Sequence, residues 1–259
     1  MQYGLYISTS GALNAAYRQD LLTGNLANVN TAGFKPDIPV TRQRDSARAE
    51  DSLGFLPSND LIERLGAGVM AARTRTSFEQ GVVRTTGNTL DLAIRGEGFF
   101  GLLDGQAGAS GGLQLTRDGR FTMDGQGRLV SVVSGMPVAG ADGRPITLLP
   151  DQAPTVSSDG AIMQGGVEVA RLAFVAMPHG APLTKLPSGH FRAEGGQAAG
   201  RRPATGRIEQ RAIEESAVDE IRTLMDIEAA ARDAQANIGM ISYQDRLLDQ
   251  AINRFGRVV

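Results

Sequence analysis

The pattern of apolar and polar positions near the end of the chain predicts one long helix. From residue 217, apolar side chains recur at alternating steps of three and four residues, the spacing of a coiled-coil seam. No proline interrupts the run, and a rise of about 1.5 Å per residue gives a helix roughly 58 Å long. Because so narrow a seam cannot bury itself, the pattern indicates a partner helix. The seam positions are Ala217, Glu220, Leu224, Ile227, Ala231, Ala234, Ile238, Ile241, Asp245, Leu248, Ile252 and Phe255.

Residues 3–30 supply the expected partner helix. Apolar residues lie on two sides of its helical wheel, which indicates neighbours on two sides. A core helix of a globular domain is the alternative interpretation. We expect Ala231 and Ala234 to allow close approach of the two helices, beside four residues that face the N-terminal helix. Those four are Ile227, Ile238, Leu248 and Phe255, and the two sides of the N-terminal helix carry Tyr6, Leu13, Tyr17 and Leu21 and, separately, Ala15, Leu22, Leu26 and Val29.

The middle of the chain predicts a β-rich domain between the two helices. Gly33 and Pro36 end the first helix, and residues 37–68 are expected to form an irregular arm with a short helix around Leu61–Leu65. From residue 69, short apolar or alternating runs are separated by Asp-Gly pairs, which favour type I′ hairpin turns with positive φ at both central residues. The predicted strands span residues 90–94, 99–103, 113–116, 129–133, 146–149 and 167–177.

Together these patterns predict an α+β fold. The paired N- and C-terminal helices, within residues 1–36 and 214–259, form a coiled coil. An irregular arm at residues 37–68 connects it to an inserted, mainly antiparallel β domain at residues 69–213. We expect that β domain to remain folded when residues 1–35 are removed.

Composition narrows the function classes. A formal charge of −2 and a pI near 5.8 give no global attraction to nucleic acid or to an anionic membrane. The chain contains no cysteine, so neither a disulfide framework nor a thiolate metal site can form. Its first residues lack the charged and apolar regions of a secretory signal, and no run approaches the ~20 apolar residues of a membrane span. We therefore expect neither a Sec-type signal nor membrane insertion.

The sequence carries no convincing catalytic, cofactor-binding or metal-binding pattern. Residues 96–101 fit the glycine pattern of dinucleotide sites, but a strand rather than a helix is predicted to follow them, so no pyrophosphate site results. His179 and His190 adjoin turn residues and are expected to be exposed loop side chains. Paired carboxylates of a cell-wall glycan hydrolase cannot be excluded by spacing alone, because their separation depends on the fold.

Four stretches resemble the flagellar axial family, specifically the basal-body rod proteins. Residues 24–35 (GNLANVNTAGFK) resemble its N-terminal signature A-N-N-[LI]-A-N-x-x-T-x-G-[FY]-[KR], with Gly24 where Asn is usual. Residues 65–69 (LGAGV) are similar to the glycine step before the β domain. Residues 90–100 (LDLAIRGEGFF) and 116–130 (TRDGRF followed by GRLV) are similar to two β-domain motifs. The C-terminal match is looser: Ala217 stands where Asn is usual, and the agreement rests on Arg232, Asn237 and Asp245.

The resemblance implies a structural subunit that is exported unfolded by the flagellar type III apparatus. Its terminal helices would pair and polymerise with copies of this chain and other rod and hook proteins into a tube that transmits torque from motor to hook. Asp245 would set register or cap the segment Asn25–Thr31. The implied assembly residues are Tyr6, Leu13, Tyr17, Leu21, Leu26, Asn25, Asn28, Thr31, Gly33, Phe34, Ile227, Arg232, Asn237, Ile238, Asp245, Leu248, Ile252 and Phe255.

Two alternative functions remain open at this point. A hook or hook-junction protein shares the terminal patterns, although hook proteins usually carry a larger β region than this chain. From a different class, a secreted β-domain glycan hydrolase could use the helices as a stalk. The implied rod subunit is not an enzyme and needs no cofactor or metal.

Overall fold

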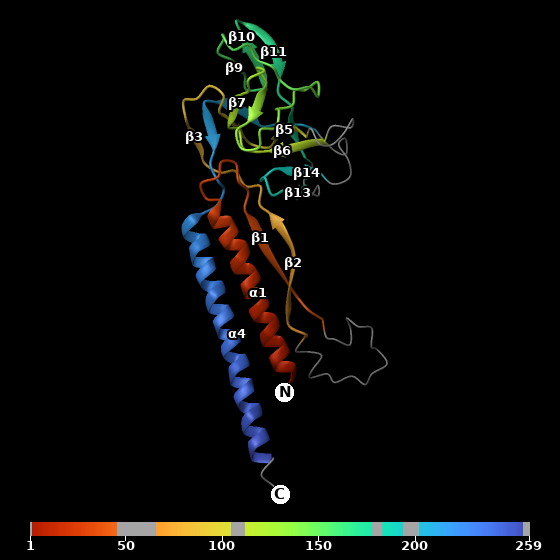
Figure 1. Cartoon of the computed structure of the whole chain (residues 1–259), viewed down its shortest axis with the longest axis vertical. Helices are drawn as coiled ribbons and strands as arrows, with labels where there is room; N and C mark the ends of the chain where they lie inside the picture. The colour runs from red at the N-terminus through yellow and green to blue at the C-terminus, as the bar shows by residue number, and fades with distance from the viewer. Residues whose placement is uncertain (1, 46–65, 105–111, 178–182, 194–201, 256–259) are drawn as a thin grey trace, which may run out of the picture. The chain divides into compact units, whose positions relative to one another are not determined.

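The computed structural model describes residues 2–45, 66–104, 112–177, 183–193 and 202–255 (Figure 1). The chain forms two compact units, each built from segments far apart in sequence. The helical unit comprises Met1–Asn28, Pro36–Ser77 and Val218–Val259. The β unit comprises Val29–Lys35 and Phe78–Ala217. The two terminal helices are in contact and the β sheets are inserted between them in sequence, which confirms the predicted fold class.

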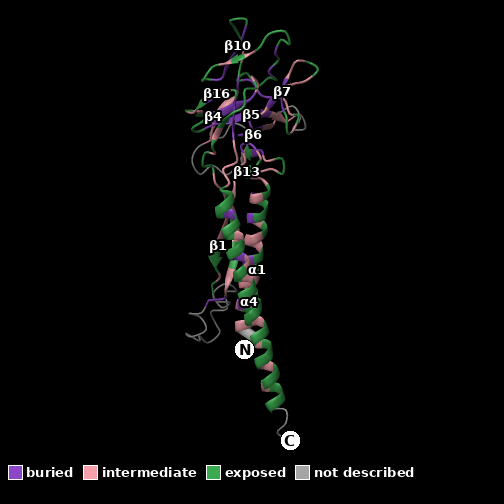
Figure 2. Ribbon diagram, turned by 90° about the vertical axis from the view of Figure 1, so that its left-hand side faces the viewer, coloured by how far each residue is buried: buried purple, intermediate pink, exposed green. Residues whose placement is uncertain are grey.

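Two antiparallel helices dominate the helical unit. Helix α1 spans Gln2–Ala27 and helix α4 spans Glu220–Phe255, and they lie side by side in Figures 1 and 2. Asp219 caps α4, because its Oδ1 accepts a hydrogen bond from the Arg222 amide at 3.0 Å. Among the described residues, no helix is both long enough and apolar enough to cross a membrane.

The seam between the helices differs from the predicted one by one residue at every second contact. The α4 positions shielded from solvent are Thr223, Ile227, Ala230, Ala231, Ala234, Asn237, Ile241, Gln244, Leu248 and Ala251. Ile227, Ala231, Ala234 and Leu248 are shielded from solvent, as predicted for seam residues, whereas Ile238, predicted to face α1, is 56% exposed. The burial of Phe255 lies outside the described side chains.

Small residues on α1 explain this seam. Gly4 lies against the Gln244 side chain and Gly11 against that of Asn237, so closely that a Cβ at Gly11 would lie 2.5 Å from Asn237 Oδ1. Ala15 and Leu22 continue the same face and are buried. At Gly11 the helices approach closely, so the short Asn237 side chain occupies the contact and the neighbouring Ile238 is exposed.

A two-stranded hairpin packs beside α1. Strand β1 (Asp37–Gln43) pairs antiparallel with β2 (Val69–Thr76), so residues expected to form an irregular arm begin with a regular strand. Asn25 fixes the start of β1: its Nδ2 donates to Asp37 O at 2.8 Å, and its Oδ1 accepts from Asp37 N at 3.0 Å. The short helix expected around Leu61–Leu65 lies outside the described residues.

The β unit consists of short antiparallel strands. Its largest sheet has six strands in the order β13-β14-β6-β5-β12-β15, a three-stranded sheet has the order β11-β10-β9, and β16-β4, β17-β3 and β7-β8 form pairs. The strands are β3 (Val83–Thr85), β4 (Leu92–Arg95), β5 (Phe99–Asp104), β6 (Gly112–Thr116), β7 (Phe121–Met123), β8 (Leu129–Ser131), β9 (Thr155–Val156), β10 (Ala161–Gln164), β11 (Val167–Arg171), β12 (Phe174–Ala176), β13 (Leu183–Lys185), β14 (Phe191–Ala193), β15 (Arg202–Pro203), β16 (Arg207–Gln210) and β17 (Ala212–Glu214).

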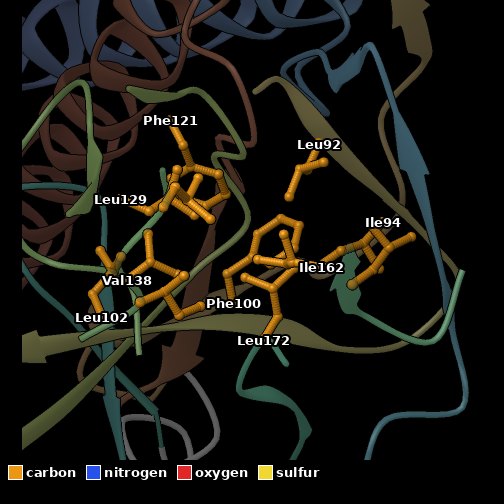
Figure 3. Packing of buried hydrophobic residues seen from close by; sticks show 12 residues of the cluster. Leu92, Ile94, Phe100, Leu102, Phe121, Leu129, Val138, Ile162 and Leu172 are labelled. Atoms are coloured by element: carbon orange, nitrogen blue, oxygen red, sulfur yellow. The ribbon is translucent and has the colours of Figure 1, made fainter. Parts of the chain in front are cut away.

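Two apolar clusters pack the described strands, and the larger contains side chains from β4, β5, β7, β8, β10 and β16. Phe100 and Phe121 meet edge to face at 5.3 Å between ring centroids, and aliphatic side chains from β4, β8 and β10 surround them (Figure 3). Among the predicted strands, 167–177 is divided into β11 and β12, and 146–149 forms only an isolated bridge at Thr147. The glycine-rich stretch 96–101 leads into β5 rather than a helix, as predicted.

Two local predictions for the β unit are wrong. The Asp-Gly pairs do not form type I′ turns, because no described aspartate has positive φ. Instead the side chains of Asp118, Asp124 and Asp142 each accept a hydrogen bond from the amide two residues onward, at 2.9–3.1 Å, which is an Asx turn. His190 is buried rather than exposed, with Nδ1 3.1 Å from Gln114 Oε1, and burial lowers its pKa. His179 lies outside the described residues.

Candidate functional site

The outer surface of the paired helices is the first candidate site. Helix α4 carries two apolar stripes besides its seam with α1. Leu224, Ile238 and Ile252 each follow a seam residue directly, and all three are exposed. Because successive residues of an α-helix turn by about 100°, this first outer stripe lies on one flank of the seam. Figure 2 shows how much of α4 is exposed.

The second outer stripe lies on the opposite flank of α4. Its members each precede a seam residue directly and are likewise exposed: Ala236, Met240, Tyr243 and Leu247. On α1, Tyr6 and Leu13 are also exposed, Leu13 to 67%. A helix with apolar residues on several sides is typical of one that contacts several neighbours. Among the described residues, α4 meets a partner helix on its seam side alone.

The other predicted assembly residues fall into two groups. Tyr17, Leu21 and Leu26 are half-buried, while Arg232 is exposed and pairs with Glu228 along α4. Asn25 is buried through its hydrogen bonds to Asp37. Asp245 is exposed and adjoins Gln244, which faces Gly4 near the start of α1. Within one chain Asp245 therefore cannot cap Asn25, which lies near the other end of the antiparallel pair.

The signature residues from Val29 to Lys35 belong to the β unit. Gly33 N donates to Glu214 O at 2.8 Å, and Ala217 N donates to Phe34 O at 3.1 Å, so the chain entering the unit is hydrogen-bonded to the chain leaving it. The Lys185 ammonium lies 3.9 Å from the Phe34 ring centroid. Thr31 and Asn28 are half-buried beside this segment in sequence. These residues thus build an intrachain junction.

A buried ionic network holds this junction. Lys35 Nζ lies 2.6 Å from Glu214 Oε1, and both side chains are fully shielded from solvent. Lys35 Nζ also donates to Glu79 O at 2.5 Å. The second carboxylate oxygen of Glu214 accepts from Arg117 Nη1 at 3.2 Å. Burial lowers the pKa of Lys35, and the charge of Glu214 opposes that shift.

Sequence reasoning did not find this network. Lys35 appeared only as the last position of the signature, and Glu214 lies 179 positions away from it. The one available signal is the rarity of lysine, since Lys35 and Lys185 are the chain's only two. Lys185 Nζ donates to Lys35 O at 2.7 Å, so both lysines serve the same junction.

Gly33 is expected to be indispensable at this junction. Its φ is +66°, and an added Cβ would lie 2.4 Å from the backbone carbon of Arg117. Gly33→Ala should therefore lower the free energy of unfolding of the β unit by about 1–2 kcal/mol for the backbone conformation, and by about 1–3 kcal/mol more for the clash. Denaturant unfolding measures both.

Gly87→Ala is the matched control for that measurement. Gly87 has a φ of +85°, but nothing lies within 4 Å of its added Cβ. Gly87→Ala should therefore lower the free energy of unfolding only by the cost of placing alanine at a positive φ. Equal losses in the two variants would contradict a close backbone contact at Gly33.

The described residues form no recognisable catalytic arrangement near these surfaces. Among the described residues, no group of three or more His, Asp and Glu side chains could hold a metal ion. The buried carboxylate of Glu214 is saturated by two cationic side chains and by the Gly81 amide at 2.9 Å. Its arrangement is that of a structural ion pair.

Comparison with known proteins gives the family. A model of the flagella basal body rod protein family matches residues 5–35, and one of the flagellar hook protein FlgE/F/G D1 domain matches residues 93–164. The flagellar basal-body rod protein FlgF of Caulobacter vibrioides is 30% identical over 260 residues, covering the whole of both chains. The chain belongs to the flagellar basal-body rod protein family. It is a structural rod subunit and not an enzyme.

Other relatives agree with the rod family. The flagellar basal-body rod protein FlgG of Bacillus subtilis is 28% identical over 98% of this chain and 99% of its own length. The flagellar hook protein FlgE of Treponema pallidum is 34% identical, but over only 54% of this chain and 30% of its own length. The rod protein therefore matches end to end where the hook protein does not. This favours the rod over the hook alternative, and the structural family removes the glycan hydrolase alternative.

Proposed function

We propose that this rod protein polymerises through its terminal helices into a tubular helical assembly that transmits torque from motor to hook. The observation that carries the proposal is the pair of outer stripes on α4, which leave apolar side chains such as Ile238 and Tyr243 exposed on both flanks of the seam. Apolar surface of this kind is a liability on a lone chain and is typical of interaction sites. Contacts between unlike surfaces that do not close into a ring build an open helical filament.

The proposed partners are copies of this chain and other axial proteins of the rod and hook. Membership of the rod family supports them. Ala15 and Leu22 are buried within the chain, so they are not available to neighbours. Tyr6, Leu13 and the two outer stripes are exposed apolar surfaces of the described terminal helices that could serve assembly.

A charge on the first outer stripe tests the proposal. Ile238→Asp leaves the seam untouched, because Ile238 is exposed and does not face α1. If a neighbouring chain covers this side chain, an unpaired buried carboxylate costs several kcal/mol, and incorporation into basal bodies should fall at least about tenfold. Immunoblots of isolated basal bodies and swimming assays measure the loss.

Asn253→Asp provides the control for this experiment. It places the same carboxylate at an exposed polar position of the same helix. Basal bodies with this variant should retain the normal amount of the chain. Normal incorporation of Ile238→Asp would refute polymerisation through this stripe. Circular dichroism of both variants establishes that α4 still forms.

We further propose that the flagellar type III apparatus exports the chain in unfolded form before it assembles in the periplasmic rod. Membership of the rod family supports this route. Cells with an inactive flagellar export gate should then retain the chain in the cytoplasm, which fractionation and immunoblotting detect. Secretion at the normal level in such cells would contradict it.

A further inference from the structure

The last segment of the β unit pairs with strands that come early in that unit. Residues 206–217, here called the closing strap, contain β16 and β17 and end at the boundary of the unit. Strand β16 pairs with β4, and β17 pairs with β3. Among the described strands, β3 and β4 have no other strand partner. The closing strap therefore completes the hydrogen-bonded ladders of two strands that the chain forms long before it.

Strand β4 lies in the core of the β unit. Leu92, Ala93 and Ile94 are almost completely shielded from solvent. Leu92 and Ile94 belong to the larger apolar cluster, to which the closing strap contributes Ile208 (Figure 3). Backbone amides and carbonyls in such a place need partners within the protein, because water does not reach them. Without the closing strap, β4 cannot occupy the core unless buried polar groups of its backbone stay unpaired.

One side chain of the closing strap connects two other segments of the unit. Gln210 Oε1 accepts a hydrogen bond from Val156 N at 3.1 Å, which is part of β9. Gln210 Nε2 donates to Thr89 O at 2.7 Å and to Pro154 O at 2.9 Å. Both ends of this amide group therefore hold β9 beside the residues that precede β4. The closing strap thus fixes a loop contact as well as two strand pairs.

The charge balance of the core also depends on the closing strap. Glu214 carries the carboxylate that Lys35 and Arg117 share, at 2.6 and 3.2 Å, and all three side chains are nearly or completely shielded from solvent. A chain that lacks the closing strap would have to bury these two cations without the carboxylate. Burial of an uncompensated charge strongly opposes folding. Strand pairing, apolar packing and charge therefore all require the closing strap.

We propose that docking of the closing strap completes the folding of the β unit, so that a growing chain has no folded β unit until residue 217 is available. Ribosomes make the N-terminal residues first, and the closing strap begins only at residue 206 of 259. The growing chain therefore stays in the unfolded form that the proposed export route requires. This link to export rests on the proposed function, whereas the folding order follows from the contacts of the closing strap.

Protease resistance of ribosome-bound chains tests the folding order. Chains that carry the natural sequence up to residue 205, 217 or 259 are joined through one polar linker to a translation-arrest peptide. The linker is long enough to hold the last natural residue outside the ribosome. A brief protease treatment cuts unfolded chains and spares folded units. Gels should show several times more protected β-unit fragment for the chains that end at 217 and 259 than for the chain that ends at 205.

Two controls separate the closing strap from chain length. The full chain with residues 206–217 replaced by a polar linker of equal length should give as little protected fragment as the chain that ends at 205. In the chain that ends at 217, Glu214→Ala should lower the amount of fragment several-fold, whereas Glu215→Ala should not, because the Glu215 pair is exposed.

Two results would overturn the proposal. The first is a protected fragment that is already abundant at residue 205, and the second is a fragment that appears only at residue 259. Neither result bears on polymerisation or on the export route, which are measured in cells. Conversely, secretion at the normal level from cells with an inactive export gate would contradict the export route and leave the folding order intact.

Discussion

Glu214→Ala is expected to destabilise the β unit far more than truncation of the neighbouring Glu215. The substitution leaves Lys35 and Arg117 buried without their shared carboxylate. Removing one partner of a buried ion pair typically costs about 3–5 kcal/mol, because the remaining charge stays desolvated. Denaturant unfolding followed by circular dichroism should show a loss of that size.

The adjacent glutamate is a close control. Glu215 pairs with Arg84 at 2.6 Å, but both side chains are well exposed. Exposed pairs contribute about 0–1 kcal/mol, so Glu215→Ala should change the free energy of unfolding by no more than that. Similar losses for the two variants would show that the Glu214 network does not hold the unit together.

Removing residues 1–35 is expected to unfold or strongly destabilise the β unit, whereas removing residues 1–28 is not. Residues 29–35 belong to that unit, and Lys35 neutralises Glu214 inside it. The longer deletion leaves a buried carboxylate with one cation fewer, at a cost of about 3–5 kcal/mol. This reverses the expectation from sequence that the β domain folds without residues 1–35.

Hydrogen exchange measures the difference between the two deletions. Amides of β5 and β6, which lie in the largest sheet, should remain protected when residues 1–28 are absent and exchange much faster when residues 1–35 are absent. Both deletions remove α1, so both should fail to assemble. Equal protection in the two deletions would place the boundary of the β unit after Lys35.

The sequence was sufficient to predict the two terminal helices and several of the β strands between them, such as β4, β5, β6 and β8. Each depends on local periodicity, and the apolar steps of α4 and the short runs near Phe100 were unambiguous. The periodicity did not determine which α4 residues face α1. Sets that contain Asn237 or Ile238 both satisfy a three-four spacing, and the rule that apolar residues face inward selects Ile238. In the structure Asn237 faces α1. Gly11 lies opposite it, and the two helices approach closely there.

Local sequence patterns could not predict the long-range ion pair or the turns that aspartate side chains form. Lys35 and Glu214 are 179 positions apart, and nothing near either residue indicates the other. The Asp-Gly pairs were assigned a backbone turn because glycine permits positive φ. At Asp118 and Asp124 the aspartate side chain bonds the backbone instead, so the aspartate needs no unusual φ. Local composition favoured a turn in both cases but did not determine its geometry.

The hydrogen bonds from Gly33 to Glu214 and from Ala217 to Phe34 hold the segment that enters the β unit beside the segment that leaves it. Their consequence concerns how rod proteins can diversify. These hydrogen bonds fix both ends of the intervening polypeptide at one junction. Loops between the two ends can therefore lengthen or shorten at little entropic cost. Such changes need not disturb the register of the terminal helices. This junction is therefore the natural boundary for exchanging β units between subunits, and a fusion made there should preserve Gly33, Lys35 and Glu214.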